Sequence, residues 1–198
     1  MTQVPNQLPT QTRLETAEKK IRESSFRENK GLGNEVGYYV FDYPASDELI
    51  VREWINYWQE KINPNMDGFQ LIVFDLFETM ISLLNDEGYL EQFISFEKEY
   101  GMDYVIEAFE EFFMLDDDSN VIVEHIISLT PDNSVVFLTG VGKCYPFLRS
   151  HKVLNNLHQK LDHVPVVMFF PGEYNGQELI LFGNIKDDNY YRAFRLVE

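Results

Sequence analysis

The residues with the clearest chemical potential lie in the stretch VVFLTGVGKCYPFLRSH, residues 135–151. Its first half is β-branched and aromatic, which predicts a strand, and the segment TGVGK follows directly. A phosphate-binding P-loop requires G-x-x-x-x-G-K-[ST], in which the lysine reaches the phosphates and the hydroxyl binds magnesium. Here Phe137 stands at the first glycine position and Cys144 at the hydroxyl position. The P-loop motif is therefore incomplete.

A looser interpretation keeps this loop as a candidate anion site, because a strand-to-helix turn presents free N–H groups at a helix N-terminus. The residues that would form such a site are Thr139, Gly140, Gly142 and Lys143. Two alternatives stay open. The glycines can simply relieve a positive φ in the turn, with the lysine solvated, or the loop can contact a partner, together with Arg149 and His151.

Candidate catalytic groups are sparse. Cys144 and His151 are seven residues apart, which on a continuous helix separates them by about 10 Å, too far for direct proton transfer. Asp75 and Glu78 lie at or just beyond the C-terminal end of a predicted strand and have the chemistry of metal ligands, but they equally suit the N-terminus of a helix. The sequence therefore predicts no catalytic residues, no metal site and no cofactor, and we expect a protein that is not an enzyme.

Two further segments are candidate contact surfaces. The glycine-rich segment KGLGNE precedes a strand, so it lacks the strand–loop–helix order of a dinucleotide fingerprint. The tail DDNYYRAFRL mixes aromatic residues with arginines, as interface hot spots do, but Tyr191, Phe194 and Leu196 would equally dock it on its own domain. The partner-contact candidates in or directly beside the two segments are Asn29, Lys30, Asn34, Glu35, Tyr190, Tyr191 and Arg192.

The elements that must position these residues follow an α/β pattern. Apolar runs predict strands at 38–43, 69–77, 134–138 and 164–170, and helices fall between them. We expect a three-layer α/β fold, Rossmann-like or resembling a degenerate P-loop fold, with a mostly parallel sheet of about four to five strands. ELILFG at 178–183 follows an Asn-Gly turn and predicts an antiparallel edge strand. Residues 1–12 are expected to be a disordered leader and 13–198 a single domain, with an acidic helical insertion at about 76–130.

Composition and charge narrow the function classes. A chain of 198 residues that is 44% hydrophobic can build one core. One cysteine, no signal-peptide pattern and no long apolar run predict a cytoplasmic protein without a membrane span. Residues 36–134 carry 22 Asp and Glu against three Lys and Arg, whereas the flanking segments are close to neutral. This excess disfavours nucleic-acid binding and favours a protein partner; mimicry of DNA by the acidic segment stays open.

The chain resembles the BrxB family of the BREX bacteriophage-exclusion systems. The resemblance rests on ENKGLGNE at 28–35, FDY at 41–43, LTGVGKCYPFLRSH at 138–151, LNNL at 154–157, PVVMFFPGEYNGQELILFG at 165–183 and DDNYYRAFRL at 187–196. It covers about residues 13–198, and the central acidic helices match only in pattern.

The resemblance implies a component of an antiviral defence machine with no assigned reaction, regarded as an accessory or adaptor subunit. It implies partners among the other BREX proteins: first a PglZ-like protein of the phosphatase superfamily, then a BrxX-like methyltransferase or a BrxC-like ATPase. We therefore expect a non-catalytic adaptor. The alternative is a nucleotide- or phosphate-binding subunit that uses the loop at 139–143. A metal-dependent nuclease is disfavoured by the charge.

Overall fold

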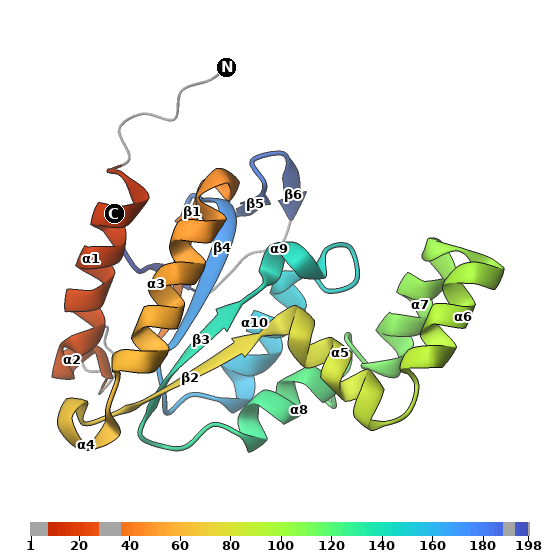
Figure 1. The fold of residues 1–198 in the computed structure, drawn as a ribbon, viewed down its shortest axis with the longest axis horizontal. Coiled ribbons are helices and arrows are strands. Elements are labelled where there is room, and N and C mark those ends of the chain that lie inside the picture. Colours follow the sequence, from red (N-terminus) through yellow and green to blue (C-terminus); the bar gives the residue numbers. More distant parts are fainter. Residues whose placement is uncertain (1–7, 28–36, 188–192, 198) are drawn as a thin grey trace.

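The structure is a computed structural model that describes residues 8–27, 37–187 and 193–197. A central sheet lies between two layers of helices, and a pair of helices extends from one end of the body (Figure 1). The helices are α1 Thr10–Arg22, α2 Ser24–Arg27, the 3-10 turn η1 Ala45–Asp47, α3 Glu48–Lys61, α4 Pro64–Asp67, α5 Leu76–Asp86, α6 Leu90–Tyr100, α7 Met102–Phe112, α8 Val121–Ser128, α9 Val141–Cys144 and α10 Ser150–Lys160. The strands are β1 Tyr38–Tyr43, β2 Gln70–Asp75, β3 Ser134–Thr139, β4 Val166–Tyr174, β5 Leu179–Leu181, β6 Ile185–Asp187 and β7 Phe194–Arg195. The predicted three-layer α/β fold with a mostly parallel sheet is confirmed.

The sheet has the order β2-β3-β4-β1-β7, and all of these neighbours are parallel. In the dinucleotide-binding sheet the first strand pairs with the second; here β1 lies between β4 and β7, so the more specific Rossmann-like prediction does not match this strand order. The predicted antiparallel return is present as β5, which pairs with the end of β4. It is not the edge, however, because β6 pairs with its other side.

Strand β2 has a largely apolar sequence, QLIVFD, as a buried parallel strand would have. Among the described strands, β2 pairs with β3 alone and forms an edge of the sheet, and most of its residues are half-buried. Composition did not reveal this position, because an edge strand under helices carries the same apolar residues as a central one.

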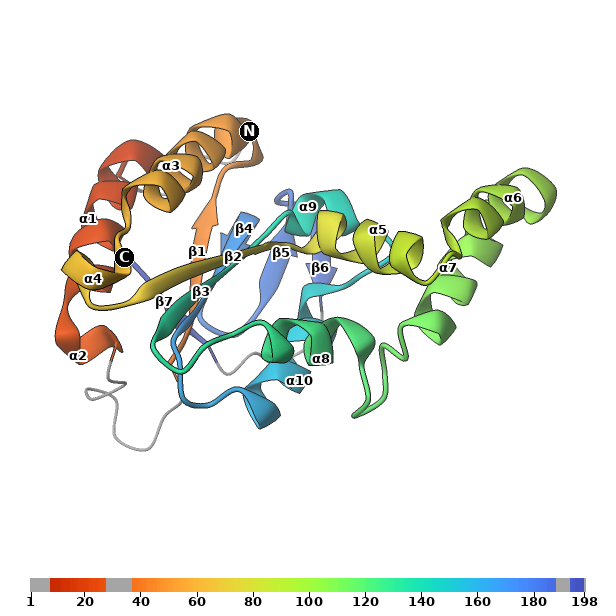
Figure 2. The ribbon, with the colours of Figure 1, turned by 60° about the horizontal axis from the view of Figure 1, so that its bottom comes forward.

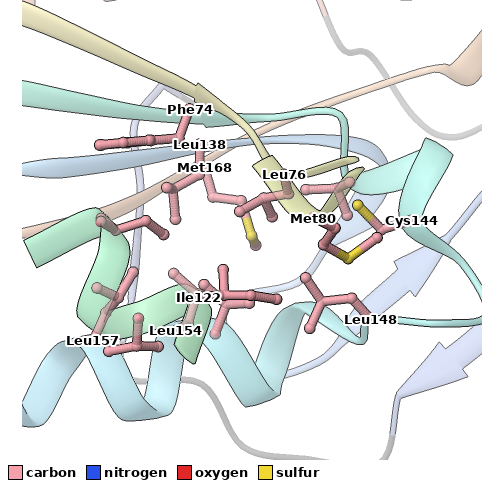
Figure 3. Close-up of a cluster of buried hydrophobic side chains, with 14 of the residues drawn as sticks. Phe74, Leu76, Met80, Ile122, Leu138, Cys144, Leu148, Leu154, Leu157 and Met168 are labelled. Atoms are coloured by element: carbon pink, nitrogen blue, oxygen red, sulfur yellow. The ribbon is translucent and has the colours of Figure 1, made fainter. Parts of the chain in front are cut away.

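Each face of the sheet has its own hydrophobic core, because successive strand residues point to opposite faces. On one face, α1 and α3 cover the odd-numbered residues of β1, including Tyr39 and Phe41, with Trp58 at the centre. On the other, α5, α8 and α10 cover Val40 and the residues of β3 and β4 that share its face. Figure 3 shows part of this second core, in which Leu76 and Met80 of α5 lie across from Ile122 of α8 and from Leu148.

The acidic helices α5, α6, α7 and α8 occupy the segment between β2 and β3. α5 and α8 pack on the body, whereas α6 and α7 form a hairpin that projects beyond it (Figure 2). Within α7, Val105 and Phe109 are buried, but Tyr104 is exposed. The hairpin therefore has a covered side and an uncovered one.

The N-terminal boundary differs from the prediction. α1 begins at Thr10, inside the segment 1–12 that was expected to be a disordered leader. A tertiary contact explains the earlier start: Thr10 is buried and its hydroxyl donates to the carboxylate of Asp47 at 2.6 Å. Residues 1–7 lie outside the described residues.

A buried ion pair ties α1 to the sheet. Arg13 and Asp42 are each 1% exposed, and Arg13 Nη2 lies 2.7 Å from Asp42 Oδ1. Arg13 Nη1 also donates to the backbone carbonyl of Asp42 at 2.6 Å. The second carboxylate oxygen of Asp42 accepts from the backbone N–H of Tyr174 at 3.0 Å and lies 3.5 Å from Arg195 Nη2. One carboxylate thus connects α1, β1, β4 and β7.

Within the described part of the chain, no helix combines the length and apolar character needed to cross a bilayer.

Candidate contact surface at the carboxyl edge of the sheet

The loop at 139–143 lies at the edge where the parallel strands end. β2 and β3 run in register, so that their last residues, Asp75 and Thr139, are paired. Ligands of open α/β sheets usually bind outside this edge. The structure therefore brings Lys143 close to residues that follow β2, although the two segments are far apart in sequence.

Lys143 is held by two carboxylates. Its Nζ lies 2.6 Å from Asp75 Oδ2 and 3.3 Å from Glu78 Oε1. Partial burial alone would lower the pKa of Lys143, but the hydrogen bonds and charges of Asp75 and Glu78 outweigh it and raise this pKa above its ordinary value. The lysine is therefore charged but already neutralised, and an anion that bound it would have to displace two carboxylates.

Asp75 also caps α5, as the helix-terminus interpretation predicted. Its Oδ1 accepts from the backbone N–H groups of Phe77 and Glu78 at 3.1 and 3.2 Å. Within the described residues, no group of three or more His, Cys, Asp or Glu side chains is arranged to hold a metal ion.

The two glycines of the loop have structural reasons of their own. Gly140 has φ +72°, and a Cβ there would lie 2.3 Å from Asp75 Oδ1, so only glycine fits. Gly142 is helical, but a Cβ would lie 3.0–3.1 Å from Phe182 and Pro171. The positive-φ alternative thus accounts for the first glycine, whereas the second allows Phe182 to lie close to α9. Lys143, which that alternative leaves solvated, is partly exposed and is also ion-paired with Asp75 and Glu78.

Cys144 is buried in the core that Figure 3 shows, beside Met80 and Leu148. Its thiol donates to the carbonyl of Gly140 at 3.3 Å. Burial, with a smaller contribution from the charge of Asp75, raises the pKa of this thiol to about 12. The helix that was assumed to join Cys144 and His151 is also absent, because α9 ends at Cys144 and α10 begins at Ser150.

We expect Cys144 to resist alkylation in the folded protein. Because its pKa is raised, the thiolate fraction at pH 8 is about one in 10⁴, and it increases only as the pH approaches 12. Iodoacetamide labelling followed by mass spectrometry should show little modification in buffer and complete modification in urea. Rapid labelling in buffer at pH 8 would mean that the thiol is accessible and ionised.

A cleft of about 250 Å³ lies between the loop and α3. Its polar walls include Arg52, Glu48 and Lys143, and these charges are paired, since Arg52 Nε also lies 2.8 Å from Glu48 Oε1. Pockets for small molecules and cofactors usually measure about 300–1,000 Å³. The cleft is at the expected place for a ligand, but it is small and its cations already have partners.

A second pocket, of about 60 Å³, lies between the segment after α9 and the β5–β6 hairpin. It can receive the end of one side chain rather than a nucleotide. Its floor is apolar, and Arg149 and Lys186 stand at its rim. Its lining residues are Val141, Tyr145, Leu148, Arg149, Ser150, Phe170, Leu179, Leu181, Ile185 and Lys186.

Two exposed aromatic residues belong to the segments that form this pocket. Tyr145 lines it, and Phe182, which is 43% exposed, directly follows the lining residue Leu181 at the turn between β5 and β6. Phe182 has φ +54°, a left-handed conformation that is uncommon for residues other than glycine and costs free energy. We refer to Tyr145, Arg149, Phe182 and Lys186 as the basic–aromatic surface.

The predicted site residues do not all lie in one place in the structure. Thr139, Gly140, Gly142 and Lys143 lie together at the carboxyl edge, and Arg149 is exposed at the pocket. His151 is half-buried in the first turn of α10. The remaining candidates lie outside the described residues: Asn29, Lys30, Asn34, Glu35, Tyr190, Tyr191 and Arg192.

The described end of the C-terminal tail docks on its own domain. β7 pairs with β1, and Leu196 is buried against the α1–α3 core. Arg195 is directed to the carbonyl of Tyr174, to which its Nε donates at 2.8 Å. For Phe194 and Leu196 the docking interpretation is therefore confirmed.

Sequence reasoning missed Phe182, Tyr145 and Lys186 as members of one surface. The segment ELILFG predicts a strand, and no neighbouring residue in the sequence indicates that its phenylalanine is exposed beside Gly142. The proximity of Lys143 and Asp75 could have been predicted from the sequence. Asp75 lies at the end of one predicted strand, Lys143 follows another, and parallel strands end at the same edge of a sheet.

Comparison with known proteins agrees with the resemblance. Residues 72–196 match the family model described as BREX protein BrxB. The chain is 49% identical over 186 residues to the BREX protein BrxB of Bacillus cereus (strain H3081.97), which covers 94% of this chain and 96% of that protein. It is 31% identical over 185 residues to the BREX protein BrxB of Escherichia coli O9:H4 (strain HS), covering 93% of this chain and 90% of that protein. No solved structure matches the chain significantly.

Proposed function

This chain belongs to the BrxB family and is a component of a BREX system, and from that premise we propose that it is a non-catalytic adaptor that acts through protein–protein contacts. Its partners are other BREX proteins, first a PglZ-like protein of the phosphatase superfamily and then a BrxX-like methyltransferase or a BrxC-like ATPase. The protein contributes shape and surface chemistry to the assembly, and the reactions belong to its partners.

The observation that carries this proposal is the basic–aromatic surface. An exposed phenylalanine held at positive φ directly after the pocket residue Leu181, together with an exposed tyrosine and an arginine in the pocket lining, has the composition of an interface hot spot. The pocket accepts the end of one apolar side chain, and Arg149 and Lys186 would pair with carboxylates around it. The groups with catalytic potential support the same proposal, because Lys143 is neutralised and Cys144 is buried and protonated.

The test is a pair of substitutions that change this surface without straining the backbone. Arg149→Glu reverses the rim charge, and Phe182→Asn removes the ring but keeps a residue that tolerates left-handed φ. A matched control on the opposite face of the sheet is Tyr57→Ala with Lys61→Glu, since both side chains are exposed on α3.

Affinity purification of the tagged protein from cells that express the whole BREX cluster should recover at least one BREX protein in stoichiometric amount. The surface variant is expected to lose about tenfold or more of that partner, a change of about 1.4 kcal/mol or more in binding. The α3 control should retain the partner, and both variants should give the circular dichroism of the parent. Full recovery of the partner with the surface variant would reject this surface, and purification of the parent protein alone would reject the adaptor role.

A further inference from the structure

The α6–α7 hairpin is packed against the body at one end and exposed at the other. At the packed end, Phe93 of α6 and Phe109 of α7 belong to the core under α5, α8 and α10, and their ring centroids are 5.4 Å apart. Lys152 of α10 joins the hairpin's end to the body through Glu110 and Asp116, each at 3.0 Å. From this base the two helices extend away from the sheet to a turn at Gly101 (Figures 1 and 2).

Large apolar side chains gather uncovered at that turn. Tyr100 is 60% exposed, and Met102 and Tyr104 are each 42% exposed. The rings of Tyr100 and Tyr104 pack on each other at 4.8 Å, and Tyr104 continues to Phe96 at 5.2 Å. The tip is thus an ordered aromatic cluster, and such a cluster left in solvent at the end of an arm marks an interaction site.

Exposed carboxylates lie on the same two helices as this cluster. Glu97, Glu99, Asp103 and Glu107 are all exposed on the same two helices, and Lys98 is the only basic residue between positions 86 and 118, against twelve acidic ones. This charge repels the phosphates of nucleic acids and of anionic membranes. It attracts a cationic partner, and tyrosine faces favour arginine in particular.

We propose that the hairpin tip, formed by Tyr100, Met102 and Tyr104 together with the exposed carboxylates of the same two helices, docks a basic segment of another protein in which arginines alternate with apolar side chains. The arginines stack on the tyrosines and pair with the carboxylates, and the apolar side chains pack against Met102, whose flexible thioether adapts to different shapes. This inference rests on the proposed adaptor function and adds a second surface of opposite charge, so that the protein bridges two partners.

The first experiment uses the purified full chain and a synthetic peptide of alternating arginine and leucine, followed by fluorescence anisotropy at low and high salt. One variant removes the apolar tip and keeps the charge: Tyr100→Ser, Met102→Ser and Tyr104→Ser. A second keeps the shape and removes charge: Glu97→Gln, Asp103→Asn and Glu107→Gln. The matched control changes exposed residues of α3: Glu53→Gln, Tyr57→Ser and Glu60→Gln.

Each hairpin variant is expected to weaken peptide binding about tenfold or more, while the α3 control binds as the parent does. Binding should also weaken with salt, because part of it is electrostatic. Absence of binding at any salt would overturn the proposal, as would equal weakening by the α3 control. If only the charge variant weakened binding, the tip would act through charge alone, as a DNA mimic does, and the docking proposal would be wrong.

Purification from cells with the whole BREX cluster separates this inference from the proposed function. The hairpin variants should lose one BREX protein and retain the one bound by the basic–aromatic surface, and Arg149→Glu with Phe182→Asn should do the reverse. Loss of the same partner by both sets would overturn the second surface while leaving the adaptor role in place. If the parent purifies alone, the adaptor role fails, and the peptide titration still decides the chemistry of the tip.

Discussion

Asp42→Ala is expected to lower the free energy of unfolding by about 3–5 kcal/mol, the usual cost of leaving one partner of a buried ion pair without the other. Arg13 is 1% exposed, so its charge has no access to water once the carboxylate is removed. The substitution also removes the acceptor of the Tyr174 backbone N–H and the carboxylate near Arg195. Urea denaturation followed by circular dichroism measures the change.

Two further variants make this prediction specific. Glu18→Ala removes a partly exposed ion pair from the same helix, that of Glu18 with Arg22, and should cost less than about 1 kcal/mol. Arg13→Met combined with Asp42→Ala should be more stable than Asp42→Ala alone, because the double variant buries no unpaired arginine at position 13. If the two single substitutions cost the same, the buried pair would contribute nothing beyond a surface pair.

Trp58→Ala should cost about 3–5 kcal/mol, because it leaves a large cavity in a well-packed core. Trp58 is completely buried, and its ring lies 5.0 Å from that of Trp54 and 5.9 Å from that of Phe137. The cavity would open between α3 and the middle of the sheet. Thermal and urea unfolding of the variant measure the loss.

Its neighbour Tyr57 supplies the control. Tyr57 precedes Trp58 on α3 but is 50% exposed, so Tyr57→Ala should change the free energy of unfolding by about 0.5 kcal/mol or less. Losses of equal size at the two positions would mean that the helix itself, rather than the core beneath it, responds to the substitutions.

Local patterns predicted the main elements of the fold, because their causes are local. β1, β3 and β4 each contain a run of β-branched, aromatic or other apolar residues, and the apolar spacing of α3 places Trp54 and Trp58 on one buried face. β6 and β7 were missed, since three and two residues are too short to display any periodicity. Their existence depends on the strands that they pair with.

Tertiary features escaped prediction for the same reason. The partner of Arg13 is 29 residues away, and nothing near either residue indicates the pairing. The edge position of β2 depends on the order of the whole sheet. At the candidate surface, the sequence identified Gly142 and Arg149, but the pocket beside them arises only when the β5–β6 hairpin folds back over α9.

The position of β1 also determines when the domain can assemble during synthesis. β1 is synthesised well before its two strand partners, β4 and β7, which begin at residues 166 and 194. Until the ribosome has released those segments, both edges of a strongly apolar strand have no native partner, and such edges invite aggregation. The sheet therefore closes around β1 only after β4 and β7 have been synthesised, and the segment that holds β1 depends on these later segments to become part of a folded domain.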